Sequence, residues 1–209
     1  MALHDAPVQP APATALRGRF WLVSRALDVQ RRDGVLGMLW ATYPVLKAKW
    51  KLRRVRVLGH ARVWGDVHIR NEGAVTLGDG VRLEGTAVRI DIACGPGAEV
   101  VIGDGTYLNY GTNIGATRSV RIGRDCAIGQ YSMIMDNDFH TAQDIWQMGE
   151  PEPVVIEDGV WLGARVIVLR GSHIGVGAVI GANSVVKGTI PPRVLAAGSP
   201  ARVIRRLDG

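Results

Sequence analysis

An aliphatic residue recurs at every sixth position between Ile156 and Ile190, and this spacing limits what the chain can fold into. The residues that open these six-residue units are Ile156, Leu162, Val168, Ile174, Ile180 and Val186. Earlier units open at Ile102, Leu108 and Ile114 and, after a shift of two residues, at Ile122, Ile128 and Ile134. A fixed period of this kind is the signature of a repeat architecture.

Six residues are enough for one short strand and one turn. The aliphatic opener is expected to point inward, and the small residue that often follows it, as at Gly163 and Gly175, lets the backbone bend without a clash. One such strand cannot bury its apolar face alone, but three units form a coil and stacked coils share a continuous core. A β-sandwich would instead show alternating residues and turns about every 8–12 residues. The period therefore predicts an all-β solenoid.

Three segments extend this pattern into a family resemblance: residues 135–140 (MDNDFH), residues 156–164 (IEDGVWLGA) and residues 190–204. Over about residues 57–206 the chain resembles the hexapeptide-repeat acyltransferases, and most closely their branch of maltose, galactoside and polysaccharide sugar O-acetyltransferases. The resemblance implies a left-handed parallel β-helix, acetyl-CoA as the co-substrate, no metal, and a homotrimer whose active sites lie between neighbouring chains.

The chain divides by composition into four parts. Residues 1–18 are rich in Pro and Ala and predict a disordered tail, and residues 19–56 predict a basic, partly helical segment. Residues 57–190 predict the β-helix, and residues 191–209 predict a C-terminal tail. The register stops at Ile134 and resumes at Ile156, so residues 136–155 predict an excursion from the β-helix. The interval of 22 residues is four longer than one coil of three six-residue units.

The positive charge of the chain is concentrated before the repeats. The whole chain has a formal net charge of +6, but residues 1–56 hold 11 Lys and Arg against 3 Asp, a net charge of +8. The repeat body is thus close to neutral and carries no recognisable nucleic-acid module, which argues against a nucleic-acid partner. The apolar and cationic residues of 19–56 have two interpretations: a helix that caps the open end of the solenoid, or a segment that contacts a membrane surface.

Cysteine usage and the N-terminus favour a cytoplasmic protein. Cys94 and Cys126 have neither a disulfide framework nor a metal-type spacing, so reduced thiols are expected. No secretory leader pattern opens the chain, and no uncharged apolar run is long enough for a membrane span. A location at the inner face of the membrane is expected if residues 19–56 bind lipid.

The excursion holds the candidate catalytic group. His140 matches the catalytic histidine of the resembled family, and a neutral histidine is suited to remove a proton from a sugar hydroxyl. Asp136 and Asp138 precede it, and either carboxylate could orient the imidazole by accepting a hydrogen bond from one ring nitrogen.

The resemblance also implies binding residues. Asn109 and Asn113 resemble a polar strip near the sugar site, although an asparagine turn or ladder at a coil corner is an equally good interpretation. The acceptor-binding asparagine of the galactoside branch would align with Gly111, so the chain departs from that branch there. On the donor side the resemblance implies the following residues: Trp161, Gly163, Ala164, Ala182, Lys187, Arg202 and Arg205. The cation at Lys187 is displaced by one residue from its position in relatives.

These observations together favour an acetyl-CoA-dependent O-acetyltransferase that acts on a sugar hydroxyl in surface-polysaccharide biosynthesis. Two alternatives stay open: N-acetylation of an amino sugar, and a non-catalytic β-helix scaffold that binds no donor. A zinc enzyme on the same fold would need three converging histidines. His60, His68 and His173 do not occupy coil positions that match His140.

Overall fold

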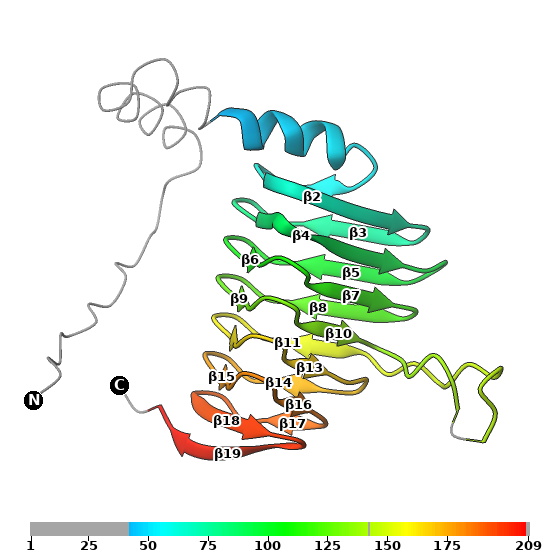
Figure 1. The fold of residues 1–209 in the computed structure, drawn as a ribbon, viewed down its shortest axis with the longest axis vertical. Coiled ribbons are helices and arrows are strands. Elements are labelled where there is room, and N and C mark those ends of the chain that lie inside the picture. Colours follow the sequence, from blue (N-terminus) through cyan, green and yellow to red (C-terminus); the bar gives the residue numbers. More distant parts are fainter. Residues whose placement is uncertain (1–41, 142, 208–209) are drawn as a thin grey trace, which may run out of the picture. The chain divides into compact units, whose positions relative to one another are not determined.

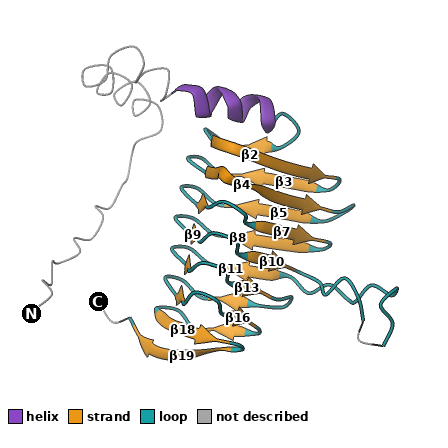
Figure 2. Ribbon diagram, viewed as in Figure 1, coloured by secondary structure: helices purple, strands orange, loops and turns teal. Residues whose placement is uncertain are grey.

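The computed structural model describes residues 42–141 and 143–207. From Arg56 onward the chain forms a β-solenoid whose coils pair in parallel, shown in Figure 1. A helix over residues 42–51 precedes the first strand (Figure 2). The prediction of an all-β solenoid of six-residue units is confirmed. The predicted tail at 1–18 and the part of 19–56 before residue 42 lie outside the described residues.

One face of the solenoid is a seven-stranded parallel sheet. Its strands are β1 (Arg56–Val57), β3 (Ala74–Leu77), β5 (Glu99–Ile102), β8 (Ser119–Ile122), β11 (Val154–Ile156), β14 (His173–Ile174) and β17 (Thr189–Ile190).

The other two faces are joined through the long strands β2 (Arg62–Asn71) and β4 (Arg82–Cys94), because β4 pairs with strands of both. The second face continues with β6 (Tyr107–Leu108), β9 (Ala127–Ile128), β12 (Trp161–Leu162), β15 (Val179–Ile180) and β18 (Val194–Gly198). The third face continues with β7 (Asn113–Ala116), β10 (Met133–Met135), β13 (Ile167–Val168) and β16 (Val185–Val186). Each strand between the terminal coils thus pairs with the coils before and after it.

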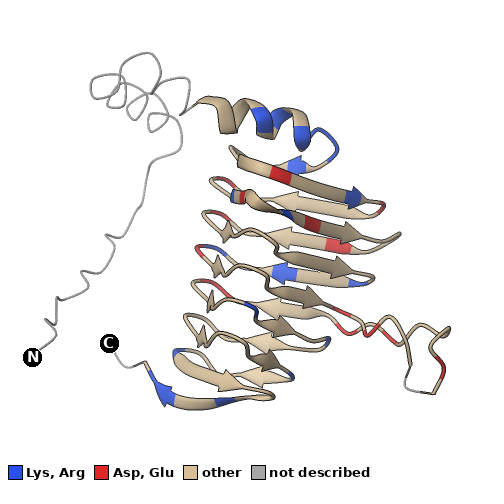
Figure 3. Cartoon of the chain, in the orientation of Figure 1, with Lys and Arg blue, Asp and Glu red and all other residues tan. Residues whose placement is uncertain are grey.

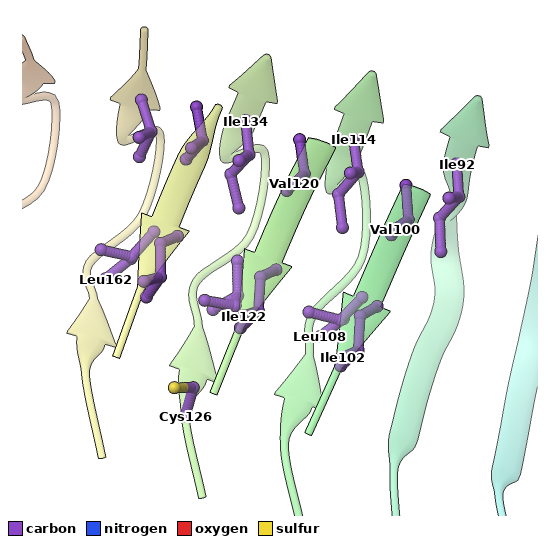
Figure 4. Packing of buried hydrophobic residues seen from close by; sticks show 14 of the residues in the cluster. Ile92, Val100, Ile102, Leu108, Ile114, Val120, Ile122, Cys126, Ile134 and Leu162 are labelled. Atoms are coloured by element: carbon purple, nitrogen blue, oxygen red, sulfur yellow. The ribbon is translucent and has the colours of Figure 1, made fainter. Parts of the chain in front are cut away.

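The unit openers form the core. Ile114 pairs with Ile134, which pairs with Val168, so openers of successive coils lie directly above one another. Every opener from Ile102 to Val186 is at least 98% buried. Figure 4 shows the resulting rows of aliphatic side chains between the faces. Each Å² of apolar surface that is removed from water stabilises the folded state by about 25 cal/mol. The buried rows are therefore the main stabilising feature of the fold.

Both ends of the stack are closed. At the N-terminal end Ala48 and Leu52, each 3% exposed, belong to the core cluster, so the helix caps the first coil. At the other end β18 pairs with β15 in parallel and with β19 (Ala201–Arg206) in antiparallel fashion. The segment after residue 190, expected as a tail, therefore contains one more stacked strand and a closing hairpin.

The excursion is longer than the sequence pattern indicated. Ile134 in β10 and Ile156 in β11 are openers on consecutive faces of the same coil, 22 residues apart. At the same edge of the next coil, Val168 and Ile174 are only six residues apart. The expectation of four extra residues was wrong, because the period alone does not show on which face a unit resumes. Sixteen residues are extra, and in Figure 1 they leave the solenoid between β10 and β11.

Lys and Arg lie along the helix and on β19, whereas Asp and Glu mark the excursion (Figure 3). Over the described residues, no helix has the length and apolarity needed to cross a membrane.

Candidate active site

The excursion, residues 136–153, has a closed base. The backbone N–H of Glu152 donates to the carbonyl of Asp136 at 2.8 Å, which joins the outgoing and returning limbs. The Glu152 carbonyl in turn accepts from the N–H of Gly171 on the following coil at 3.1 Å. The loop is thus anchored to the solenoid at both of its ends.

His140 lies on the exposed outgoing limb, and its Nδ1 is hydrogen-bonded to the backbone carbonyl of Ile145. A carbonyl can only accept, so Nδ1 carries the proton in the neutral ring. The other ring nitrogen, Nε2, then carries the lone pair. This is the tautomer that a general base needs, because Nε2 can accept a proton from a substrate hydroxyl.

Local hydrogen bonds fix the carbonyl that orients His140. The N–H of Thr141 donates to the carbonyl of Gln147 at 2.8 Å, and the N–H of Asp144 donates to Thr141 Oγ1 at 3.0 Å. The N–H of Trp146 donates to Asp144 Oδ1 at 2.8 Å. Asp144 therefore forms a turn with its own side chain, which is a common use of this residue type. The turn holds Ile145 beside the imidazole.

Asp136 is fully buried, and its carboxylate faces the solenoid. Its two oxygens accept the backbone N–H groups of Thr117, Arg118 and Ser119 at 2.6 to 3.0 Å, and the Thr117 hydroxyl at 3.0 Å. Asn137 donates to Thr117 Oγ1 at 2.6 Å and accepts from the N–H of Phe139 at 2.7 Å. Asp136 thus joins the two-residue register shift at 117–118 to the base of the excursion.

Asp138 pairs with an arginine. Its Oδ2 accepts from Nε of Arg170 at 2.5 Å, and Nη1 of the same guanidinium contacts the carboxylate of Glu152. The hydrogen bond with Asp138 raises the pKa of Arg170 above its ordinary value. Of the hydrogen bonds among the described residues, none joins Asp136 or Asp138 to the imidazole, so the expectation that either one orients His140 stays a prediction.

Asn109 and Asn113 lie at the opposite end of β7 from the excursion. Asn109 Oδ1 accepts from the N–H of Tyr110 at 2.8 Å, and its Nδ2 donates to Gln130 at 3.3 Å. The N–H of Thr112 donates to the Asn109 carbonyl at 3.3 Å, so Asn109 is the first residue of a turn at a solenoid edge. Asn113 is the half-buried first residue of β7. A side chain at Gly111 would place its Cβ 2.6 Å from the Tyr131 ring, so Tyr131 occupies the space there.

The expected donor residues divide into two groups. Trp161 points outward from β12 with 57% of its surface exposed, and Gly163, Ala164 and Ala182 follow on the adjoining edge. A Cβ at Gly163 would lie 2.7 Å from the backbone nitrogen of Ala182, so close stacking of coils already requires glycine there. Lys187 follows β16 and is exposed.

Arg202 and Arg205 lie on β19, where both are exposed. Within one chain, Trp161 belongs to the second face, whereas His140 follows a strand of the third. The structure therefore groups Trp161 with Gly163, Ala164 and Ala182 but does not bring His140 to them.

Sequence reasoning missed Arg170 and Thr117. Arg170 occupies a turn position that favours no particular residue type, and only the acidic residues at both ends of the excursion hint at a nearby cation. Thr117 marks the register shift, but nothing in the sequence links it to Asp136.

Comparison with known proteins decides the family. The model of the bacterial transferase hexapeptide family (six repeats) matches residues 153–188. The putative lipopolysaccharide biosynthesis O-acetyl transferase WbbJ of Escherichia coli K12 is 32% identical over 193 residues, which cover 87% of this chain and 94% of WbbJ. The chain belongs to the hexapeptide-repeat acyltransferases. It is accordingly an enzyme that transfers acetyl groups.

Two further similar proteins have names that refer to a sugar substrate. The galactoside O-acetyltransferase of Escherichia coli K12 is 34% identical over 114 residues, which cover 54% of this chain and 56% of that protein. The crystal structure of the polySia-specific acetyltransferase NeuO matches 68% of this chain and 69% of NeuO, with a TM-score of 0.52 and 30% sequence identity. The resemblance to sugar O-acetyltransferases of this family is thereby confirmed.

Proposed function

We propose that this hexapeptide-repeat acyltransferase transfers the acetyl group of acetyl-CoA to a hydroxyl of a sugar, with His140 as the general base. The observation that carries the proposal is the hydrogen bond from His140 Nδ1 to the Ile145 carbonyl on an exposed loop, with no hydrogen bond to Nε2 from the part of the chain that the structure describes. The names of WbbJ, the galactoside enzyme and NeuO support a sugar acceptor. WbbJ and NeuO favour a precursor of a surface polysaccharide.

The chemistry assigned to His140 balances in two steps. Nε2 takes the hydroxyl proton as the sugar oxygen bonds to the thioester carbonyl carbon, which gives a tetrahedral oxyanion. Backbone N–H groups at the solenoid edges are suited to stabilise this oxyanion. The oxyanion collapses with loss of the thiolate, and the imidazolium returns its proton to the sulfur. The ester and free coenzyme A leave, and His140 is neutral again.

The separation of His140 from Trp161 within one chain supports a site shared between copies of the chain. A site that uses both residues needs His140 from one chain and Trp161, Gly163, Ala164 and Ala182 from its neighbour. We therefore include a homotrimer in the proposal, with Lys187, Arg202 and Arg205 as candidates for the phosphates of the donor.

The proposal is tested by the variant His140→Ala, with His173→Ala as its matched control. His173 is also an exposed histidine, but it pairs with Glu157 on a regular coil. We expect His140→Ala to lower kcat by at least about 100-fold while acetyl-CoA affinity, measured by calorimetry, is unchanged. His173→Ala should match the wild type. Activity of His140→Ala within tenfold of wild type would remove His140 as the base.

Two further measurements address the alternatives and the assembly. Thiol release with hydroxyl-only and amino-sugar acceptors separates O- from N-acetylation, and a folded protein that binds no acetyl-CoA would contradict the proposed donor. Mixed trimers of His140→Ala and Trp161→Ala chains should recover about a quarter of wild-type sites if each site joins two chains. No recovery after verified subunit exchange would contradict a shared site.

A further inference from the structure

Arg170 lies on the coil that follows the excursion. Among the described residues of that coil, it is the one whose side chain contacts both limbs of the excursion. We propose that Arg170 is a positioning residue that holds the loop in the conformation in which His140 is oriented. The proposal rests on the proposed role of His140 as the base, and it assigns Asp138 to Arg170 rather than to the imidazole.

The contacts of Arg170 span the base of the loop. Nε donates to Asp138 Oδ2 on the outgoing limb at 2.5 Å, two residues before His140. Nη1 contacts the Glu152 carboxylate on the returning limb and lies 3.3 Å from the Glu150 carbonyl. A planar guanidinium with donors in a fixed fork can bind two limbs at once, which a lysine ammonium does with less geometric control.

Arg170 itself has a rigid support. It lies between β13 and β14, where the backbone N–H groups of Leu169 and Gly171 donate to Val186 and Glu152 at 3.0 and 3.1 Å. A side chain at Gly171 would place its Cβ 2.3 Å from the Glu152 carboxylate, so glycine leaves room for this carboxylate. The guanidinium side chain is 33% exposed, against 46% and 54% for Asp138 and Glu152. The cation is thus the least exposed member of the cluster.

A loop with sixteen extra residues needs such a support. Every unrestrained residue can occupy several backbone conformations, and their loss costs about 1–2 kcal/mol per residue. Catalysis needs the base within hydrogen-bond reach of the substrate hydroxyl, and a displacement of about 1 Å can cost about 100-fold in rate. Freeing the limb that carries His140 should therefore lower kcat without removing any group that contacts the substrates.

Asp138 could act in one of two ways, through Arg170 or directly on the imidazole. If Asp138 acts through Arg170, then Asp138→Asn and Arg170→Gln disturb the same restraint, and the double variant should be no slower than the slower single variant. If Asp138 instead orients the imidazole directly, the two losses should multiply. The double-mutant cycle thus separates a restraint on the loop from a carboxylate–histidine pair.

The experiment measures kcat, the KM for acetyl-CoA and hydrogen exchange of peptides from residues 138–152 in all three variants. We expect Arg170→Gln to lower kcat about 10- to 100-fold, with KM within threefold of wild type and faster exchange confined to the excursion. Arg170→Lys should restore part of kcat and part of the protection. Arg124→Gln is the matched control, because Arg124 also pairs with an aspartate, Asp158, at a different edge of the solenoid.

Three results would overturn the proposal: wild-type kcat in Arg170→Gln, unchanged exchange in the excursion, or multiplied losses in the double variant. If the wild-type protein transfers no acetyl group to any acceptor, the proposed function fails. Hydrogen exchange would still show in that case whether Arg170 restrains the loop. Arg170→Lys keeps the test open if Arg170→Gln does not fold.

Discussion

Replacing Asp136 with asparagine removes one negative charge and keeps the shape of the side chain, at a position with no exposed surface. The carboxylate accepts the N–H groups of Thr117, Arg118 and Ser119 together with the Thr117 hydroxyl. An amide has only one acceptor oxygen. If that oxygen faces Arg118 and Ser119, the amide nitrogen faces Thr117 and Asn137, which both offer hydrogens.

The expected loss of stability follows from these contacts. A hydrogen bond to a charged group contributes about 1.5–3 kcal/mol, whereas a neutral one contributes about 1 kcal/mol. Reducing three backbone contacts from charged to neutral, and leaving at least one donor without a partner, gives a loss of about 3 kcal/mol in the free energy of unfolding. Asp138→Asn is the matched comparison. Its carboxylate is nearly half exposed in an ion pair with Arg170, so its loss should stay below about 1 kcal/mol.

Urea unfolding followed by circular dichroism, at a fixed protein concentration, measures both variants. The concentration must be fixed because an oligomer gains apparent stability by mass action. A lower midpoint with an unchanged slope would report a true change in stability. A loss under 1 kcal/mol for Asp136→Asn would refute the reasoning, because it would mean that the three N–H groups find equivalent partners without the charge.

Three further predictions concern the core, the cap and the outer face of the helix. Burial raises the pKa of the Cys94 and Cys126 thiols, so a thiol reagent at about pH 8 should label neither cysteine in the native protein and both in denaturant; rapid native labelling would contradict their burial. Ala48→Asp should lower the free energy of unfolding because Ala48 is buried in the cap. Trp50 is 64% exposed, so Trp50→Glu should change the free energy of unfolding by no more than about 0.5 kcal/mol. Vesicle flotation with anionic lipid then tests the outer face of the helix, and failure of the wild type to float would end the membrane interpretation.

The period of the sequence was sufficient to predict the core, because each opener has the same environment in every coil. On the seven-stranded face, Ile102 pairs with Ile122 and Ile122 pairs with Ile156, so these openers keep the same register from coil to coil. Such regularity lets a local pattern report a global fold. The cap was also predictable in kind, since a solenoid must cover its terminal coil with apolar residues such as Ala48 and Leu52.

The details of the candidate site could not be predicted in the same way. His140 was found from its motif, but its hydrogen bond to the Ile145 carbonyl depends on how the loop folds back on itself. The partners of Asp136 and Asp138 are 17 to 32 residues away in the sequence, on other coils. Sequence proximity to His140 predicted only that one of the two carboxylates orients the imidazole, and it gave no sign that Asp136 binds backbone N–H groups or that Asp138 pairs with Arg170.

From Ile92 onward, where Ile92 pairs with the opener Ile114, the irregular intervals of the solenoid lie along one edge, the edge that joins the third face to the seven-stranded sheet. At this edge the interval between openers is ten residues from Ile92 to Ile102, eight from Ile114 to Ile122 and 22 from Ile134 to Ile156. The edge that follows the seven-stranded sheet keeps the six-residue interval in the same coils, as from Ile122 to Ile128.

Insertions at one edge leave the hydrogen-bonded faces intact, because each strand still meets its partner in the next coil. The chain can therefore place a long loop, the backbone N–H groups that bind Asp136, and Arg170 next to one another without disturbing its core. A rigid stack with one variable edge is well suited to an enzyme, since the faces provide stability and the edge carries His140, the base of the proposed function. On this argument, changes of acceptor specificity among similar chains should be found in the loops of this edge rather than in the openers.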